Sequence, residues 1–267
     1  MIRVSDMSFA YGKGRQVFDH LSFDLHEGRI YGLLGLNGAG KTTLLNLMSG
    51  LLFPVSGSVS VNGMEAKERR VEMLSQLFYV TDGVLLPAMR LWRFVDYYAP
   101  FYPNFSKDTL TDCLKAFGQD GDLKLSELSL GQKQKFSISF ALATQPKILL
   151  MDEPTNGLDI PSKSTFRKLL MQHMADDQLV VISTHQVHDV AQLLDEVVVM
   201  GEDGTLRDMT VAGTGEQYAF GVEPSAEGVL YAEPCAEGYR TIRHNETGGD
   251  SKVDLELLFN ALTQHRL

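Results

Sequence analysis

One short segment of the sequence has the residue types that bind phosphate groups. It reads Gly-Leu-Asn-Gly-Ala-Gly-Lys-Thr-Thr and fits the pattern G-x-x-x-x-G-K-[ST]. Its glycines can take backbone angles closed to other residues, so successive N–H groups can turn toward an anion. Lys41 offers a charge to the β- and γ-phosphates, and the hydroxyl of Thr42 can ligate Mg²⁺. The pattern predicts that a nucleoside triphosphate contacts the whole segment: Gly35, Leu36, Asn37, Gly38, Ala39, Gly40, Lys41, Thr42 and Thr43.

Acidic and basic groups follow two later apolar runs. Asp152 and Glu153 come directly after Ile148–Met151, and His185 follows Val180–Ser183. In an open parallel sheet, active groups gather at the carboxyl ends of strands, beside the phosphate-binding loop. We expect Asp152 to hold Mg²⁺, Glu153 to orient the attacking water as a general base, and His185 to contact the γ-phosphate.

These groups need an alternating set of strands and helices to bring them together. Near-continuous apolar runs predict buried parallel strands, at Ile30–Leu34, Phe78–Val80, Ile148–Met151, Val180–Ser183 and Val197–Met200. Helical periodicity lies between them, at Thr42–Ser49, Lys107–Phe117, Gln132–Thr144, Ile160–Met174 and Val187–Leu194. The alternation predicts an α/β fold with a mostly parallel sheet. Val59–Val61, followed by Asn62-Gly63, predicts instead an antiparallel element that ends in a turn.

Two regions interrupt the alternation. Residues 87–128 have a helical pattern and a cluster of aromatic residues, which either form the core of a helical insert or are partly exposed to dock a partner. The tail after Gly201 contains a near-duplication, Glu223–Gly228 and Glu233–Gly238, which predicts two similar turns around a short strand at Val229–Ala232. An amphipathic helix is expected over Asp254–Leu262.

Composition narrows the possible class of protein. The 267 residues are 44% apolar, enough for a substantial core, and the formal charge of −10 argues against a nucleic-acid partner. Cys113 and Cys235 match no metal-ligand spacing, so a reducing compartment is expected. The N-terminal residues alternate like a strand and lack the pattern of a signal peptide. Since the sequence has no apolar run of about 20 residues, a role at the membrane would require a partner.

Taken together, these features resemble the ATP-binding-cassette (ABC) family. The segment Leu128-Ser-Leu-Gly-Gln-Lys-Gln-Lys135, upstream of Asp152, is similar to the signature sequence that other P-loop ATPases lack. The resemblance covers about the first 210 residues. It implies a P-loop NTPase domain over residues 1–210 with an N-terminal antiparallel β element and a helical signature subdomain at about 87–135. Residues 211–267 would form a small β-rich appendage with a closing helix.

The resemblance also implies roles for further residues. Tyr11 would stack on adenine, and Val17 would line the same face. Ser129, Gly131 and Gln132 would contact the ATP bound by a second ABC subunit, and Asp159 would lie in the loop that links the two ATP sites. The implied catalytic groups are Lys41, Glu153 and His185, and the implied metal ligands are Thr42, Asp152 and Asp82.

Two positions depart from the family pattern. Leu130 stands where glycine is commonest, and Asp82 stands where the family usually has glutamine. A carboxylate at position 82 could coordinate Mg²⁺ strongly, but it would repel the γ-phosphate if it approached without the metal.

The implied function is that of an ATP-hydrolysing subunit that drives a membrane exporter from the cytoplasmic face. It would act with a separate integral-membrane subunit and a second ABC subunit, identical or different, using ATP and Mg²⁺. One alternative is a soluble ATPase of the same family that acts on a non-membrane assembly scaffold. Another is a nucleotide-gated binding subunit without activity.

Overall fold

The central sheet is built from six short strands, five of which follow the predicted apolar runs, whereas the sixth, Leu206–Thr210, was not predicted. The computed structural model describes residues 1–12, 14, 16–83, 85–119, 121–201, 204–246, 249, 251–264 and 266–267. The strand order is β10-β9-β3-β8-β7-β6, and all neighbouring strands are parallel except β10, which is antiparallel to β9. The bounds are Arg29–Gly35 (β3), Leu77–Val80 (β6), Ile148–Asp152 (β7), Leu179–Thr184 (β8), Glu196–Met200 (β9) and Leu206–Thr210 (β10). The predicted parallel sheet is confirmed, and β7, β8 and β9 are buried along their whole length.

A second, antiparallel sheet is formed by residues of the amino-terminal part of the chain and packs in one core with α1. Its order is β2-β1-β4-β5, with bounds Ile2–Ala10 (β1), Gln16–Leu25 (β2), Ser56–Val61 (β4) and Met64–Glu65 (β5). The predicted turn at Asn62-Gly63 joins β4 to β5. Both of its residues have positive φ, 48° and 77°, as a tight hairpin turn of two residues requires.

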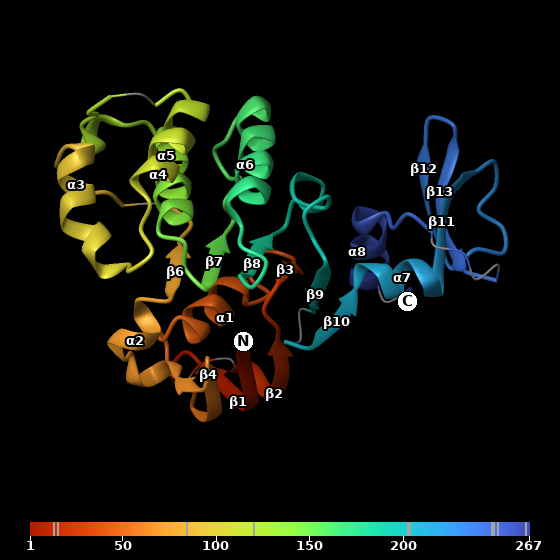
Figure 1. The fold of residues 1–267 in the computed structure, drawn as a ribbon. Coiled ribbons are helices and arrows are strands. Elements are labelled where there is room, and N and C mark those ends of the chain that lie inside the picture. Colours follow the sequence, from red (N-terminus) through yellow and green to blue (C-terminus); the bar gives the residue numbers. More distant parts are fainter. Residues whose placement is uncertain are drawn as a thin grey trace.

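Helices cover both faces of the central sheet (Figure 1). They are Lys41–Met48 (α1), Val71–Leu74 (α2), Leu91–Tyr98 (α3), Lys107–Ala116 (α4), Leu130–Ala143 (α5) and Ile160–His173 (α6). Alternate strand residues point to opposite faces. Thus Leu33 of β3 packs in the core that includes α1 and the antiparallel sheet, whereas Leu34 packs in the core that includes α5 and α6. No helix of the described residues is both long and apolar enough to cross a bilayer.

The aromatic cluster of the helical insert is divided between core and surface. Phe140 of α5 lies at the centre, with five other rings within 6.4 Å of its own: Phe78, Phe94, Tyr102, Phe105 and Phe136. Three rings are exposed, namely Tyr97 (53%), Tyr98 (41%) and Phe101 (66%). Most of the cluster therefore forms the core of the insert, and a smaller part of it faces solvent.

The prediction of a helix at Val187–Leu194 is wrong. Only a single 3₁₀ turn, Val187–Asp189, forms there, and turns follow it up to β9. Val187, Val190, Leu193 and Leu194 are buried as the pattern suggested. A spacing of three residues suits a 3₁₀ turn as well as an α-helix, so periodicity over so short a segment could not separate the two.

The tail forms a small lobe beside the main body (Figure 1). It contains a three-stranded antiparallel sheet of order β11-β13-β12 between two helices. The bounds are Val211–Gln217 (α7), Tyr218–Glu223 (β11), Tyr231–Cys235 (β12), Gly238–His244 (β13) and Leu255–Thr263 (α8). The β-rich appendage is confirmed, but the expected pair of matched turns is wrong. Glu223–Gly228 is mostly a loop, whereas Glu233–Gly238 is mostly strand and hairpin turn, because the strand begins two residues later than expected.

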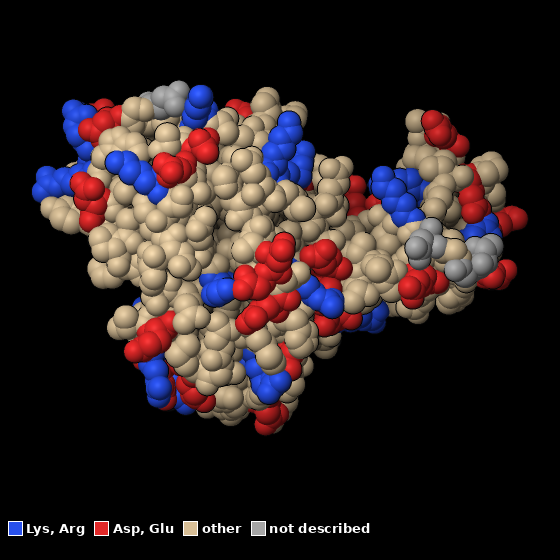
Figure 2. All heavy atoms as spheres, viewed as in Figure 1, with Lys and Arg blue, Asp and Glu red and all other residues tan. Residues whose placement is uncertain are grey.

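Helix α8 joins the lobe to the main body. Leu255, Leu258 and Phe259 belong to the large core that includes the turn after β8, whereas Leu257 and Ala261 pack with the three-stranded sheet. The helix starts where Asp254 caps it by accepting a hydrogen bond from the Leu257 N–H. On the face shown in Figure 2, basic and acidic side chains are interspersed over both the body and the lobe.

The two cysteines provide a test of this packing. Cys113 of α4 is completely buried, and burial together with the nearby Asp112 carboxylate raises the pKa of its thiol to about 12. Only about one such thiol in ten thousand is a thiolate at pH 8, whereas Cys235 is partly exposed. A chromogenic disulfide reagent is therefore expected to label one thiol quickly in the native chain and the second only after unfolding. Cys235→Ser should remove the fast phase. Two thiols that react at similar rates in the native chain would contradict the packing of α4.

Candidate active site

One cavity of about 560 Å³ lies at the carboxyl ends of the parallel strands. The loop after β3, Glu153 after β7, His185 after β8 and the loop after β6 all reach it, whereas Asp152, the last residue of β7, does not line it. Its lining consists of Tyr11, Val17, Asn37, Gly38, Gly40, Lys41, Thr42, Thr43, Asp82, Glu153, Asn156 and His185. The predicted residues Gly35, Leu36 and Ala39 belong to the same loop but do not line the cavity.

Glycine is required in this loop for conformational and steric reasons. Gly38 and Gly40 have φ of 84° and 105°, which other residues rarely adopt. A Cβ on Gly40 would also lie 3.0 Å from side-chain atoms of both Val17 and Phe18. Helix α1 begins immediately afterwards, at Lys41. The free N–H groups of its first turn therefore lie beside the cavity and favour an anion there.

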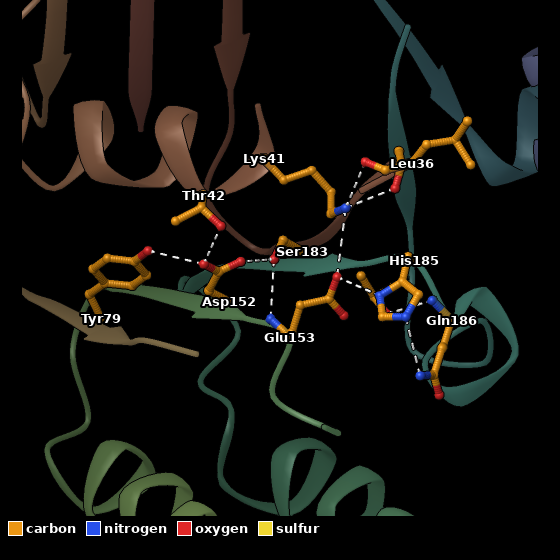
Figure 3. A network of polar contacts seen from close by, with 11 residues as sticks. Leu36, Lys41, Thr42, Tyr79, Asp152, Glu153, Ser183, His185 and Gln186 are labelled. Atoms are coloured by element: carbon orange, nitrogen blue, oxygen red, sulfur yellow. Dashed lines mark hydrogen bonds and ion pairs between the residues drawn. The ribbon is translucent and has the colours of Figure 1, made fainter. Parts of the chain in front are cut away.

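The Lys41 side chain is buried within this loop. Its Nζ donates to the carbonyl oxygens of Gly35 and Leu36, at 2.8 and 3.3 Å, and lies 3.6 Å from Oε1 of Glu153 (Figure 3). Burial lowers the pKa of Lys41, and the carboxylates of Glu153 and Asp152 oppose that change. The ammonium group is thus positioned where the loop meets the acids.

Asp152 is nearly fully buried and is surrounded by hydroxyl groups (Figure 3). Thr42 Oγ1 donates to its Oδ2 at 2.7 Å, the Ser183 hydroxyl donates to its Oδ1, and the Tyr79 hydroxyl lies 3.5 Å from Oδ2. Burial and the Asp152 charge raise the pKa of Tyr79, so that its hydroxyl keeps its proton. The acid therefore connects α1, β6 and β8.

The same atoms form a suitable partial site for Mg²⁺. A threonine hydroxyl and a carboxylate oxygen lie side by side, and Mg²⁺ prefers such hard oxygen ligands. Asp82 is exposed on the wall of the same cavity. Among the described residues, no group of three or more His, Cys, Asp or Glu side chains is arranged to hold a metal ion by itself. Mg²⁺ is commonly held by one or two carboxylates together with substrate phosphates, and these residues fit that arrangement.

Glu153 combines a strained backbone with an unused acceptor. Its φ of 46° lies in the left-handed region, and its N–H donates to the backbone oxygen and Oγ of Ser183, at 3.1 and 3.2 Å. Oε1 lies 2.8 Å from Nδ1 of His185, whereas Oε2 is buried and has no hydrogen-bond partner in the described structure. A residue in this region stores strain of about 1–3 kcal/mol, which the surrounding structure must offset. Oε2 of this carboxylate can therefore accept a further hydrogen bond.

The two residues expected near adenine lie at the mouth of the cavity. The Tyr11 ring packs edge-on against Phe9, and its hydroxyl is hydrogen bonded to that of Thr43 at 3.0 Å. Val17 lies against Gly40. Gln76, the glutamine just before β6, does not replace the family's glutamine at position 82, because its Nε2 donates to the Glu72 carbonyl oxygen. This leaves Asp82 as the polar side chain that follows β6 into the cavity.

The segment similar to the ABC signature lies outside the cavity lining. Ser129 caps α5, and its side chain and that of Gln132 bond each other's backbone N–H groups. Gly131 packs against the loop after Glu153, so closely that a Cβ there would lie 2.7 Å from the Gly157 carbonyl oxygen. Asp159 caps α6 and lies 3.8 Å from Lys135. The structure thus brings the phosphate loop, the acids and His185 together and leaves Ser129, Gly131, Gln132 and Asp159 outside the cavity lining.

Sequence reasoning missed several polar side chains of the site. They are Tyr79, Asn156, Ser183 and Gln186. Ser183 belongs to a predicted strand, but its place beside Asp152 depends on the register between β7 and β8, which pairs these two residues. A sequence does not show that register. Asn156 belongs to the same loop as Asp159, which the resemblance assigns to the link between the two ATP sites. Only the folded structure shows that the Asn156 side of this loop lines the cavity.

Comparison with known proteins agrees with this geometry. Residues 18–156 match the family profile described as ABC transporter. The bacitracin transport ATP-binding protein BcrA of Bacillus licheniformis is 30% identical over 228 residues, which span 78% of this chain and 69% of that protein. A solved ATP-binding subunit of an ABC transporter has a TM-score of 0.74 and 25% identity and covers 81% of this chain and 92% of its own. A dimeric cassette in a post-hydrolysis state, with ADP and phosphate bound, has a TM-score of 0.67 and 23% identity and covers 79% and 98%.

The fold and the cavity define a P-loop ATPase. The chain belongs to the ABC transporter family, in which it is an ATP-binding subunit that hydrolyses ATP. The transporter hypothesis is therefore supported, and the alternative of a soluble ATPase on an assembly scaffold is not. The alternative of a binding subunit without activity is likewise not supported.

The steric demand at Gly40 gives a direct test of the cavity. Gly40→Ala combines a strained φ with two contacts at 3.0 Å, so we expect it to distort the loop and weaken nucleotide binding at least about tenfold, or about 1.4 kcal/mol. A fluorescent ATP analogue measures the dissociation constant. The matched control is Gly63→Ala, which has a similarly positive φ of 77° but open space around it. Equal affinities of the two variants would show that the contacts at Gly40 do not shape the site.

Proposed function

We propose that this chain is the motor of a bacterial exporter and that it hydrolyses ATP between two ABC subunits. One observation carries the proposal: Lys41, Glu153 and His185 line the cavity, whereas Ser129 and Gly131 do not. One chain therefore lacks part of the site that the family resemblance implies, and a second subunit would complete it. The solved cassette dimer with bound ADP and phosphate supports this arrangement.

In the proposed mechanism the groups around the cavity divide the chemical work. Lys41 and the N-terminus of α1 bind the phosphates, and Tyr11 and Val17 contact the base. Mg²⁺, held by Thr42 and Asp152 with Asp82 nearby, would neutralise charge on the phosphates. Glu153 accepts a proton from the attacking water through its unpartnered Oε2. His185 holds Oε1 and thereby leaves Oε2 as the carboxylate oxygen without a partner.

The aromatic surface of the helical insert is the proposed contact for a membrane subunit. Tyr97, Tyr98 and Phe101 are exposed together at the end of α3 and in the 3₁₀ turn after it. Large exposed rings often mark a protein–protein contact. We place the chain at the cytoplasmic face of the membrane, where both cysteines would stay reduced; they are unpaired in the structure. The name of the bacitracin transport relative supports an exporter.

We also propose that the chain divides near residue 210. Strand β10 ends the central sheet at Thr210, and α7 begins at Val211. Residues 1–210 would form the nucleotide-binding domain, with the helical subdomain at about 87–135, and residues 211–267 would form the appendage. Helix α8, which packs on both parts, would hold the appendage in place.

Substitution of Glu153 tests the general base. Glu153→Gln keeps the shape of the side chain but removes its basicity, so we expect turnover to fall about 10²- to 10⁴-fold while ATP binding stays intact. Steady-state hydrolysis and a nucleotide-binding titration measure the two effects. Glu72→Gln, on the exposed side of α2, is the control and should behave like the unmodified chain. Near-normal hydrolysis by Glu153→Gln would remove Glu153 from this role.

A mixing experiment tests whether two chains share one site. Lys41→Ala removes the phosphate-binding charge but keeps Ser129, whereas Ser129→Arg blocks the signature but keeps the cavity. We expect each variant to be inactive alone and their mixture to regain hydrolysis, because one site of the mixed dimer has both halves intact. Activity per chain of the unmodified protein should also rise with concentration. A Ser129→Arg variant that is fully active alone would contradict the shared site.

A further inference from the structure

Both ring nitrogens of His185 have a polar partner (Figure 3). Nδ1 lies 2.8 Å from Oε1 of Glu153, and Nε2 lies 3.3 Å from Nε2 of Gln186. A neutral imidazole carries one proton, which either nitrogen can hold. Only a proton on Nδ1 lets the ring donate to the Glu153 carboxylate. The other tautomer would turn a lone pair toward the negative oxygen and weaken that contact.

The partner of Gln186 decides between the two tautomers. An amide can accept through its oxygen or donate through its nitrogen, and either could face the histidine. Here Nζ of Lys163, on α6, lies 3.3 Å from Oε1 of Gln186. An ammonium group only donates, so it takes the amide oxygen and leaves the NH₂ group to donate to Nε2 of His185. Nε2 must then accept, and the ring proton lies on Nδ1.

A buried acid holds Lys163 in this position. The side chain of Asp189 is almost fully buried, and its Oδ2 accepts from Nζ of Lys163 at 2.5 Å. On the same helix, Arg167 donates to the Asp189 carbonyl oxygen at 2.9 Å. A further titratable neighbour is His188, whose Nε2 lies 2.9 Å from Asp189 Oδ1. The ammonium group of Lys163 is thus held between Asp189 and the amide oxygen of Gln186.

The turn that carries Asp189 is itself packed on the side of the appendage. Val187 and Val190 flank Asp189 and belong to the same apolar core as Leu255 and Leu258 of α8. The turn is therefore held between α6 and α8. A chain of donors starts at Lys163, passes through Gln186 and His185, and ends at Glu153.

We propose that Lys163, anchored by Asp189, is a positioning residue that fixes the tautomer of His185 through the amide of Gln186. The resulting Nδ1–H holds Oε1 of Glu153 and leaves Oε2, which has no partner in the described structure, as the free acceptor. The catalytic consequence rests on the proposed role of Glu153, whereas the tautomer itself can be measured without nucleotide.

Gln186→Glu gives the sharpest test because it reverses the direction of the hydrogen bond to His185 while keeping the shape of the side chain. A carboxylate at position 186 only accepts, so it still binds Lys163 but requires a proton on Nε2 of His185. Two-bond ¹H–¹⁵N spectra of the nucleotide-free chain, with labelled histidine, identify the protonated nitrogen. We expect a proton on Nδ1 alone in the unmodified chain and a proton on Nε2 in the variant. An unmodified chain protonated on Nε2, or an unchanged variant, would overturn the proposal.

Substitutions of Lys163 separate positioning from folding. Lys163→Met should give a mixture of tautomers and lower kcat for ATP about ten- to hundredfold, as loss of an orienting contact typically does, with KM within about twofold. Lys163→Arg keeps a donor beside Gln186 and should preserve the Nδ1 proton. Lys168→Met, exposed on the same helix, is the control. Lys163→Met/Asp189→Leu removes both charges and should show the same mixture even if the single variant unfolds. A fixed Nδ1 proton in that double variant would contradict the role of Lys163.

The spectra also keep this inference separate from the proposed catalytic role. If Glu153→Gln hydrolyses ATP normally while Gln186→Glu moves the proton as expected, the role of Glu153 fails and the positioning by Lys163 stands. If Glu153→Gln is inactive and the proton stays on Nδ1 in Gln186→Glu, the reverse holds.

Discussion

The hydrogen bonding of one buried carboxylate constrains much of this site. Asp152 is almost without exposed surface, and a buried charge is costly unless polar partners surround it. Its partners come from three different elements, through Thr42 at the start of α1, Tyr79 on β6 and Ser183 on β8. Satisfying this acid therefore sets the distance between the phosphate loop and the sheet. Because Glu153 follows directly, its position beside His185 depends on the same contacts.

Local signals were enough to predict the parts of the fold that depend on neighbours in sequence. The phosphate loop follows from glycines and Lys41, since the needed backbone angles are local. The parallel strands follow from apolar runs, and the turn at Asn62-Gly63 follows from the ability of Asn and Gly to adopt the positive φ that both residues have. Helix α8 could be predicted as well, because its apolar spacing and the Asp254 cap lie within ten residues.

Features set by contacts between distant segments could not be predicted in this way. The register that pairs Asp152 with Ser183 is a property of two strands about 30 residues apart. The 3₁₀ turn at Val187–Asp189 has helical spacing, but the packing of α6 and α8 determines its conformation. Lys163 is likewise one charged residue of a helix until the fold places it beside Gln186. The repeated Glu-Pro motif led to the wrong prediction of two matched turns, because each copy meets a different neighbour.

The proline in β12 affects how the small lobe meets other molecules. Pro234 lies within an outer strand of the sheet whose order is β11-β13-β12. An outer strand offers unpaired backbone groups that another chain can bind, which is a common route to aggregation. Proline has no N–H to donate, and within sheets it is found mainly in such edge strands. The interrupted edge thus discourages sheet growth from chain to chain, which suits a protein whose proposed assembly uses a different surface.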